Sequence, residues 1–435
     1  LQPTSRPQWL KGWLSGILGA LLMAGLTGFP DGPFASDWIK HWALLHELTV
    51  QPWPVVIELN QQVQILRFYV GAYLVPAGLA KLSHSDVGGW AAVWFTLGYA
   101  LIFRTVARRQ QGTALVAIGL LLAMSGADAL ADHLHRRLLG WPAPPWLGIH
   151  NEAWAYGAFE LPLEYSGVVT ALAWVPHQAI AVYLVTLEVL NRDNRPARSA
   201  LALGLLALWS PYGLIGLLPL VATEVWARRR ELSGWRLHLC VIAGLGFAIT
   251  VASYLASDLP QGTNCLACLP EHLQHAAQYL PFLGFELAPF ALILGRQMWR
   301  DRLNRAALLC LLILPLFHAQ TPDLVMRASL APILLLALRS VERLMAGGPA
   351  LLQRLAPLVG LALALPSVVS EVTYLRQGAA AHQAYAKPDP LSAPWMRLVA
   401  RERRYTAAQF FDLCGWQYLP QYFAPHRPVV LSEPE

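Results

Sequence analysis

The sequence predicts an all-α membrane protein that crosses the bilayer many times, with about 8 to 11 transmembrane helices. Three observations predict this class. Of the 435 residues, 56% are hydrophobic and only 13% are charged, whereas soluble domains are roughly 25% charged. Apolar runs of about 20 residues, long enough to cross the hydrocarbon, recur along the chain. Arginine clusters separate these runs, and such clusters usually face the cytoplasm.

Composition also excludes some classes of protein. The formal charge of +6 does not indicate a nucleic-acid partner, because the basic residues gather in clusters between the apolar runs. The five cysteines do not have the arrangement of a disulfide scaffold. Two of them, Cys240 and Cys310, lie within apolar runs, where a free cysteine usually acts as a small core residue.

The transmembrane segments follow from the alternation of apolar runs and charge. Residues 9–29 predict a retained anchor rather than a signal peptide, because the chain stays apolar after them. Five arginine-rich segments are expected to face the cytoplasm: residues 104–111, 191–198, 228–236, 296–305 and 339–348. The other predicted spans are residues 89–106, 113–132, 166–190, 235–257, 279–298, 306–318, 326–343 and 350–369.

Two stretches require a different structure. Residues 199–227 begin and end at arginine clusters, so they must form a hairpin, and Pro211 in the sequence SPYG breaks the helix at its middle. Two half-depth helices fit, because broken backbone is tolerated in a membrane where it is buried in protein or lines a cavity. Residues 67–82 are predicted to lie as a helix along the outer membrane face. The alternative makes them a span and turns the cluster at 104–111 outward.

This topology divides the chain into two regions. Residues 1–369 form the integral membrane domain, within which residues 31–88 are the first outer loop and carry interfacial helices. Residues 370–435 form an extracytoplasmic C-terminal tail. The tail is rich in aromatic residues but too short for a secure core of its own, so it is expected to dock as a small cap.

The first outer loop places acidic residues, Asp31 and Asp37, shortly after the anchor. On a helix that starts near Ser36, Asp37 and His41 are one turn apart and share a face. A carboxylate and an imidazole are then presented together at the bilayer surface. In the alternative interpretation, Asp37 only complements the helix dipole, and His41 packs with neighbouring tryptophans at the headgroup belt.

A second polar group ends the predicted span 113–132. Asp128 and Asp132 are four residues apart, so they are expected to face one way and to share a cation, a proton or a partner. With His133 and His135 they have the composition of a divalent-metal site. This spacing is common by chance, so a helix end that enters water is the favoured interpretation, and we assign no residue to a metal.

Two further motifs each allow two interpretations. His177 follows Pro176 inside an apolar span, where an ionisable group indicates a functional site, although the ring could instead satisfy carbonyl groups freed by the proline. Cys265 and Cys268 are followed by two histidines, which allows a zinc site. A local disulfide is favoured there, because the segment is expected to lie in an oxidising compartment.

The turn between the predicted spans 306–318 and 326–343 contains His318, Gln320, Asp323 and Arg327. Arg327 would enter the membrane edge unless it were paired. One partner is Asp323, at the i, i+4 spacing of an internal ion pair. The other is an anionic ligand, because the forked donors of a guanidinium suit a phosphate group.

At this point the sequence resembles a known superfamily. The acidic loop FPDGPFASDWIKHW, the helix YVGAYLVPAGLAKL and the span GWAAVWFTLGYALIFRTVARR look like the amino-terminal module of GT-C membrane glycosyltransferases. The hairpin SPYGLIGLLPL is similar to one in that superfamily. LAWVPHQAIAVYL and PDLVMRASLAPILLLAL are similar to segments of bacterial members linked to exopolysaccharide production.

The resemblance implies a GT-C-like helical bundle that transfers a sugar from a polyprenyl-phosphate or polyprenyl-diphosphate donor to a saccharide or lipid acceptor. It implies that an acidic residue of the first outer loop is the general base, which maps onto Asp37 and then Asp31, and that a cation stabilises the leaving phosphate, which maps onto Arg327. Ser36 stands where the superfamily commonly has a second acidic residue. A bound divalent cation is therefore an open question. The expected catalytic residues are Asp37, Asp31 and His41, and the expected substrate-binding residues are Arg327, Asp323, His318, His177 and Gln320.

The resemblance also implies a place in the cell, the bacterial inner membrane, with the active face in the periplasm. The expected partners are the polyprenyl-linked donor, membrane lipid, the acceptor and other polysaccharide-synthesis proteins, with no nucleic acid. The alternatives are a polysaccharide polymerase or ligase with the same lipid-linked substrates, a transporter, and a non-catalytic subunit of an export system. A transporter would be expected to show internal repeats and charges near the bilayer midplane.

Overall fold

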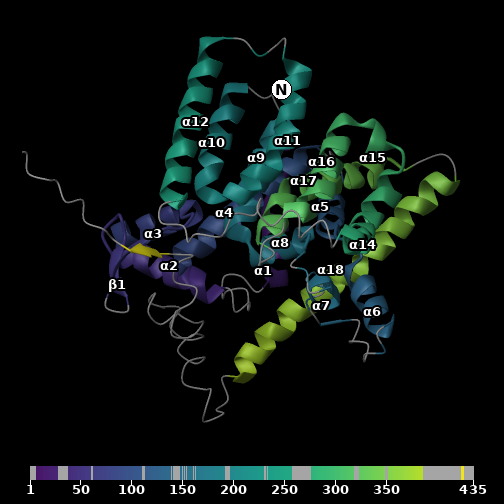
Figure 1. The fold of residues 1–435 in the computed structure, drawn as a ribbon, viewed down its shortest axis with the longest axis horizontal. Helices are drawn as coiled ribbons and strands as arrows, with labels where there is room; N and C mark the ends of the chain where they lie inside the picture. Colours follow the sequence, from purple (N-terminus) through teal and green to yellow (C-terminus); the bar gives the residue numbers. More distant parts are fainter. Residues whose placement is uncertain are drawn as a thin grey trace, which may run out of the picture.

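The structure is a computed structural model, and its described part is almost entirely helical (Figure 1). It describes residues 6–27, 38–59, 62–109, 113–138, 140, 147, 148, 150, 152, 154–159, 161, 163–191, 196–229, 232, 234–256, 276–317, 323–347, 351–385 and 423–425. Six of the described helices are long and apolar enough to cross a membrane: they include residues 9–26, 87–109, 235–255, 277–294, 323–346 and 353–376. The prediction of a helical membrane protein is confirmed at this level.

The N-terminal region combines two long helices with a small outer layer. The helices are α1 (Arg6–Thr27) and α4 (Val87–Arg109), and between them lie α2 (Trp38–Val50), β1 (Val56–Leu59), β2 (Gln62–Leu66) and α3 (Gly71–Ser83). α1 and α4 approach closely at Gly16, where an added Cβ would lie 2.6 Å from the carbonyl oxygen of Ala100. The two helices can therefore pack backbone to backbone.

The predicted helix at residues 67–82 is present as α3, which has 13 residues. At 1.5 Å per residue it is about 20 Å long, which is short of the roughly 30 Å needed to cross the hydrocarbon. This length argues against the alternative in which the segment is a span. The antiparallel hairpin of β1 and β2 was not predicted.

The sheet also ties down part of the C-terminal tail. β3 (Phe423–Pro425) pairs antiparallel with β2, with Phe423 opposite Leu66 and Pro425 opposite Gln64. This short piece of the tail therefore lies against the first outer loop.

Two predicted spans are interrupted, which corrects the sequence interpretation. The span expected at 113–132 is divided into α5 (Ala114–Leu122) and α6 (Asp128–Leu138). The chain turns between them because the amide of Ala127 donates to the carbonyl of Phe285 at 3.0 Å, in place of a bond within one helix. The span expected at 166–190 is divided into α8 (Val168–Trp174) and α9 (Pro176–Val189), because Pro176 cannot continue the helical hydrogen bonding.

The hairpin predicted at 199–227 is observed as α10 (Pro196–Trp209) and α11 (Pro211–Arg228), with the break at Ser210. The two helices have 14 and 18 residues, or about 21 Å and about 27 Å of length, which exceeds half of the roughly 30 Å of hydrocarbon. The half-depth part of the prediction is therefore corrected, because each helix runs without a break from its arginine-rich end to Ser210. α10 also packs against α12 (Trp235–Ala256), where an added Cβ on Gly204 would lie 2.4 Å from Gly244.

The remaining helices form the C-terminal half of the bundle. They are α7 (Trp154–Phe159), α14 (Ala276–Leu294), α15 (Gln297–Arg300), α16 (Arg302–Ile313), η2 (Leu314–Phe317), α17 (Asp323–Ala346) and α18 (Leu351–Tyr385). α17 is the most buried of the six long apolar helices and lies at the centre of the bundle. The boundary predicted at residue 369 falls inside α18, because the end of the apolar run marks a change of environment rather than the end of the helix.

The two ends of the bundle differ in the segments that they carry. In Figure 1 the end of α11, the beginning of α12 and the short helix α15 lie in the upper half, whereas β1, α6 and the end of α18 lie in the lower half. The top therefore carries arginine-rich segments, and the first outer loop lies at the other end.

Candidate functional site

The break between α8 and α9 positions His177 in the interior of the protein. Pro176 starts α9, so His177 lies in its first turn, and its side chain is 1% exposed. Its ring centroid lies 4.2 Å from that of His41 and 5.8 Å from that of Tyr73. The Tyr69 ring lies almost parallel to it at 6.2 Å. His177 is therefore part of a cluster of aromatic rings that comes from three segments.

His41 lies inside this cluster rather than among lipid headgroups. It is fully buried, and its Nδ1 lies 2.7 Å from the hydroxyl of Tyr73. Burial, with smaller contributions from the positive charges of Lys40 and Arg327, holds the pKa of His41 well below its usual value. The ring is therefore neutral at neutral pH.

Gln178 connects the cluster to α11 and α17. In the amide orientation that satisfies its neighbours, the nitrogen donates to Ser210 Oγ at 2.8 Å, and the oxygen accepts from Arg327 Nε at 3.0 Å and from His177 Nε2 at 3.1 Å. Ser210 caps α11, since its Oγ also accepts from the amide of Gly213 at 3.1 Å. One amide group thus fixes the tip of the hairpin and the first turns of two other helices.

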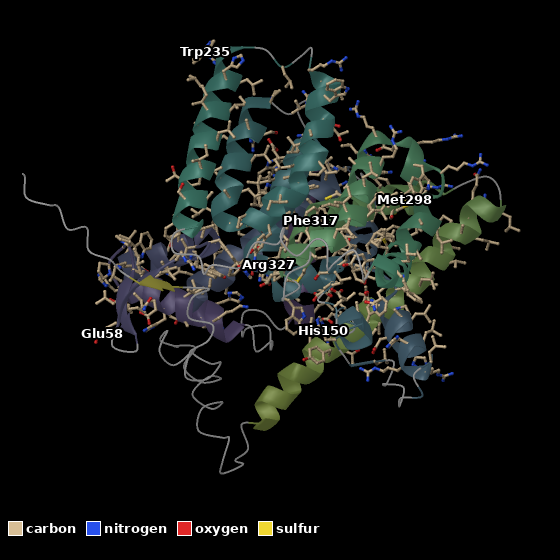
Figure 2. All side chains as sticks on the ribbon, in the orientation of Figure 1. Glu58, His150, Trp235, Met298, Phe317 and Arg327 are labelled. Atoms are coloured by element: carbon tan, nitrogen blue, oxygen red, sulfur yellow. The ribbon has the colours of Figure 1, made fainter. Side chains whose placement is uncertain are left out.

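Arg327 is 5% exposed, although it carries a permanent charge. Its Nη2 pairs with Asp323 Oδ1 at 2.6 Å, so the internal ion pair foreseen at i, i+4 does form. Its other donors reach the Tyr69 hydroxyl and the Gln178 amide. Figure 2 places Arg327 near the middle of the molecule, far from Trp235 at one end.

The structure brings together some of the expected site residues and leaves others untested. His41, His177 and Arg327 share one cluster, and Asp323 joins it at a half-exposed edge. The turn that carries Arg327 and the SPYG tip at Ser210 were expected to converge, and they meet at Gln178. The expected residues Asp31, Asp37, His318 and Gln320 lie outside the described residues, as do Cys265 and Cys268.

Three residues of the site were missed in the sequence: Tyr69, Tyr73 and Gln178. Gln178 carried a usable signal, because an amide directly after a histidine in an apolar span must find polar partners. Tyr69 and Tyr73 gave little indication of a site in the sequence, since aromatic residues are expected wherever a helix lies along a membrane surface.

The acidic and histidine-containing motif at the predicted span end is arranged differently from a metal site. Asp132 pairs with Arg136 at 2.9 Å on the same helix, whereas Asp128 is fully buried beside Ser125. The two carboxylates therefore have separate partners. Within the described part of the chain, no group of three or more His, Cys, Asp or Glu side chains is arranged to hold a metal ion.

The arrangement around Gln178 can perform a specific kind of chemistry. It offers the guanidinium of Arg327, which is paired with the half-exposed Asp323, a neutral imidazole at His41, tyrosine hydroxyls and aromatic faces, all in an apolar interior where electrostatic interactions are strong. Such a site suits a ligand with an anionic group next to an apolar or ring-shaped part. No protein-family model, curated protein or solved structure matches this chain.

Proposed function

We propose that this protein is a membrane glycosyltransferase that moves a sugar from a polyprenyl-phosphate donor to a saccharide or lipid acceptor. The observation that carries the proposal is the buried guanidinium of Arg327, held between Gln178, Tyr69 and Asp323 at the tip of the α10–α11 hairpin. A guanidinium is suited to a phosphate because its donors bind two oxygens at once. The proposed location is the bacterial inner membrane, with the site open to the periplasm, in polysaccharide or glycolipid synthesis.

In the proposed reaction the acceptor hydroxyl oxygen attacks the anomeric carbon of the donor sugar. The bond from that carbon to the phosphate oxygen breaks, and the phosphate leaves with the electron pair. Arg327 stabilises the negative charge that grows on the phosphate. The proton of the acceptor hydroxyl goes to a general base, for which Asp37 is the first candidate and Asp31 the second.

His41 supports this assignment through its position. It lies four residues after Asp37, and its neutral ring is buried against Tyr73 and His177. Because burial holds the pKa of His41 well below its usual value, the ring stays uncharged and acts by position, through its hydrogen bond with the Tyr73 hydroxyl, rather than by taking up the proton. A divalent cation remains compatible with the proposal, and none of the steps above depends on it.

A polysaccharide polymerase or ligase with lipid-linked substrates is the second candidate. The observation that favours it is a contact of His150, which belongs to the predicted large outer segment after α6. Its Nδ1 lies 2.8 Å from Oε2 of the buried Glu371 on α18. Both candidates use a lipid-linked phosphate donor, so they differ in the product: a single added sugar for a transferase, and a joined or growing chain for a polymerase or ligase.

Transfer of labelled sugar in proteoliposomes tests the proposal. The purified chain is supplied with a short-chain polyprenyl-phosphate sugar and with glycan or glycolipid acceptors from a polysaccharide-producing bacterium. We expect labelled product from the wild type and a loss of at least about tenfold for Arg327→Gln, since a hydrogen bond to a charged group contributes about 1.5–3 kcal/mol.

Arg339→Gln is the matched control, because Arg339 lies on the same helix but pairs with Glu342 at a part-exposed position away from the site. It should leave transfer unchanged. Equal transfer by Arg327→Gln and the wild type would contradict the proposed role of Arg327.

A further inference from the structure

A group of five buried carboxyl side chains lies apart from the Arg327 site. The group, called the carboxyl cluster below, consists of Asp128 on α6, Glu152 and Glu164 in the segment after α6, Glu286 on α14 and Glu371 on α18. Each is at most 7% exposed, and each acts electrostatically on at least one other member. Gathering five carboxyls in an apolar interior costs free energy unless their charges are neutralised.

Two members lie on segments that touch. The amide of Ala127, beside Asp128, donates to the carbonyl of Phe285, beside Glu286, at 3.0 Å, and the two carboxyl groups act on each other's ionisation. Two neighbouring buried carboxylates repel each other unless one of them carries a proton. Gly126 permits this approach, because an added Cβ there would lie 2.2 Å from Glu286 Oε2. Trp154 Nε1 also donates to Glu286 Oε1 at 3.2 Å, and Ser125 Oγ donates to Asp128 Oδ2 at 3.3 Å.

Other oxygens of the cluster lack a partner. Glu152 Oε1 accepts from the amide of Gly167 at 2.9 Å, but Glu152 Oε2 has no hydrogen-bond partner among the described residues. The same holds for Asp128 Oδ1 and for the hydroxyl of Tyr183, which lies within electrostatic reach of Glu152. A buried polar atom without a partner costs about 1–3 kcal/mol. Acceptor oxygens in this position therefore indicate a small, positively charged ligand.

His150 connects the cluster to solvent. Its Nδ1 lies 2.8 Å from Glu371 Oε2, and its side chain is 23% exposed, whereas that of Glu371 is 1% exposed. Burial alone would lower the pKa of His150, but the charges of Glu371, Glu164 and Glu152 raise it to about 10. His150 and Glu371 thus form an imidazolium–carboxylate pair. Figure 2 shows His150 toward the lower side of the molecule, below Arg327 in this view.

The remaining four carboxyls have no ion-pair partner among the described residues. Within the described part of the chain, Asp128, Glu152, Glu164 and Glu286 form no ion pair with lysine or arginine. Burial and neighbouring carboxylates raise the pKa of Glu152 well above its usual value, and burial also raises that of Glu164. Other titratable or charged groups on the surrounding elements are Asp132, His133 and Arg136 on α6, Tyr165 before α8, Tyr183 on α9, Cys310 on α16 and Tyr374 on α18.

We propose that the carboxyl cluster is a proton-binding site that exchanges protons with solvent through His150. In the exchange step, the imidazolium gives the proton on Nδ1 to Glu371, which leaves a neutral histidine and a neutral carboxylic acid. His150 then takes a new proton from a hydronium ion in the solvent, which leaves a water molecule. Protons are favoured over a metal ion because neighbouring buried carboxylates are relieved of their repulsion when one of them is protonated and because the described residues offer no metal-binding group. This inference does not rest on glycosyl transfer.

Infrared spectroscopy of the full chain in nanodiscs tests the site directly, because a protonated carboxyl group has its own carbonyl absorption. At neutral pH we expect this absorption in the wild type and a shift when H₂O is replaced by D₂O. Glu152→Gln and Asp128→Asn should each remove part of its intensity. His150→Gln should keep the intensity but slow the shift in D₂O. Glu342→Gln is the control, because Glu342 lies on α17 at a part-exposed position and pairs with Arg339.

Three results would overturn the proposal. The first is absence of the absorption in wild type at neutral pH, or its disappearance at the usual carboxyl pKa of about 4. The second is its loss when sodium, magnesium or calcium is added at constant pH, which would make the cluster a metal-ion site. The third is unchanged intensity in both Glu152→Gln and Asp128→Asn. The wild-type titration needs no variant, so a variant that fails to fold does not leave the proposal undecided, and sugar transfer is not part of any readout.

Discussion

Gln178 joins three helices through one amide group. It belongs to α9, its nitrogen bonds to the cap of α11, and its oxygen bonds to Arg327 on α17. Because its partners Ser210, His177 and Arg327 are buried, the loss of this side chain leaves several polar atoms without hydrogen bonds at once. The position of the guanidinium therefore depends on a neutral residue that carries no charge of its own.

Gln178→Leu is expected to lower the free energy of unfolding by about 1–3 kcal/mol, the usual cost of a buried polar group left unsatisfied. Thermal unfolding in detergent measures this change. Gln297→Leu is the control, since Gln297 is exposed on α15. Equal melting temperatures for Gln178→Leu and Gln297→Leu would contradict the hydrogen-bond network described for Gln178.

His41 makes stability depend on pH. Its pKa is lowered in the folded state by burial and by Lys40 and Arg327, whereas an unfolded histidine has a pKa of about 6.5. Below about pH 6.5 the unfolded chain binds a proton that folded His41 does not bind. Stability is therefore fully present above this pH and falls by about 1.4 kcal/mol per pH unit below it, until the folded pKa is reached.

His41→Gln is expected to reduce this acid-side loss of stability, because glutamine does not titrate. Melting temperatures between pH 7 and pH 5 provide the measurement. His84→Gln is the control, since His84 is exposed at the end of α3. If the wild type and His41→Gln lost stability equally over this range, His41 would not be the group responsible.

At the level of helices, the break at Ser210 positions the beginning of α11 next to Arg327. Pro211 ends the path of α10, and Ser210 Oγ caps α11 by accepting from the amide of Gly213 at 3.1 Å. α11 then packs closely on α17 beside Arg327, since an added Cβ on Gly216 would lie 1.7 Å from the carbonyl oxygen of Ala328. A glycine is thus needed for the tip of the hairpin to reach the arginine.

Ser210→Ala is expected to cost about 1 kcal/mol of stability through loss of the cap and also to weaken binding of polyprenyl phosphate, because Gln178 loses a partner. Asp301→Ala is the matched control. Asp301 caps α16 by accepting from the amides of Leu303 and Asn304 at 2.9 and 3.0 Å, away from the site. Both variants should have a lower melting temperature than the wild type, and only Ser210→Ala should bind polyprenyl phosphate less tightly. Loss of binding in both, or in neither, would contradict the role of the cap in the site.

Of the two helix breaks that have a local cause, a proline, one was predicted from the sequence. Pro211 predicts the end of α10 from the sequence alone. Pro176 carried the same kind of signal, but residues 166–190 were still interpreted as one span. The break between α5 and α6 has no proline, and it depends on a hydrogen bond from Ala127 to Phe285, which lies far along the chain. The pairing of β2 with β3 and the meeting of Asp128 with Glu286 are long-range in the same way, so no local pattern reports them.

At the level of the whole molecule, orientation in the membrane connects the fold to the proposed function. The arginine-rich ends of the long helices are expected in the cytoplasm, and the first outer loop lies at the opposite end of the bundle. α3 is too short to span, so α4 is expected to be the crossing that follows α1. The Arg327 site is then expected to lie on the side away from the cytoplasm.

Cysteine labelling of spheroplasts checks this orientation. In a background without the native cysteines, Asp86→Cys at the turn before α4 should react with a membrane-impermeant thiol reagent from outside. Arg300→Cys at the end of α15 should react only after the membrane is opened. The reverse pattern would place the site on the cytoplasmic side and contradict the proposed orientation.

The central claim is that the Arg327 site binds a polyprenyl-linked phosphate, and equilibrium binding of polyprenyl phosphate to the protein in nanodiscs tests it most directly. We predict that Arg327→Gln weakens binding by about tenfold to a hundredfold, as expected for loss of about 1.5–3 kcal/mol from a charged hydrogen bond, while Arg339→Gln binds as the wild type does. The same affinity for Arg327→Gln and the wild type would contradict the account.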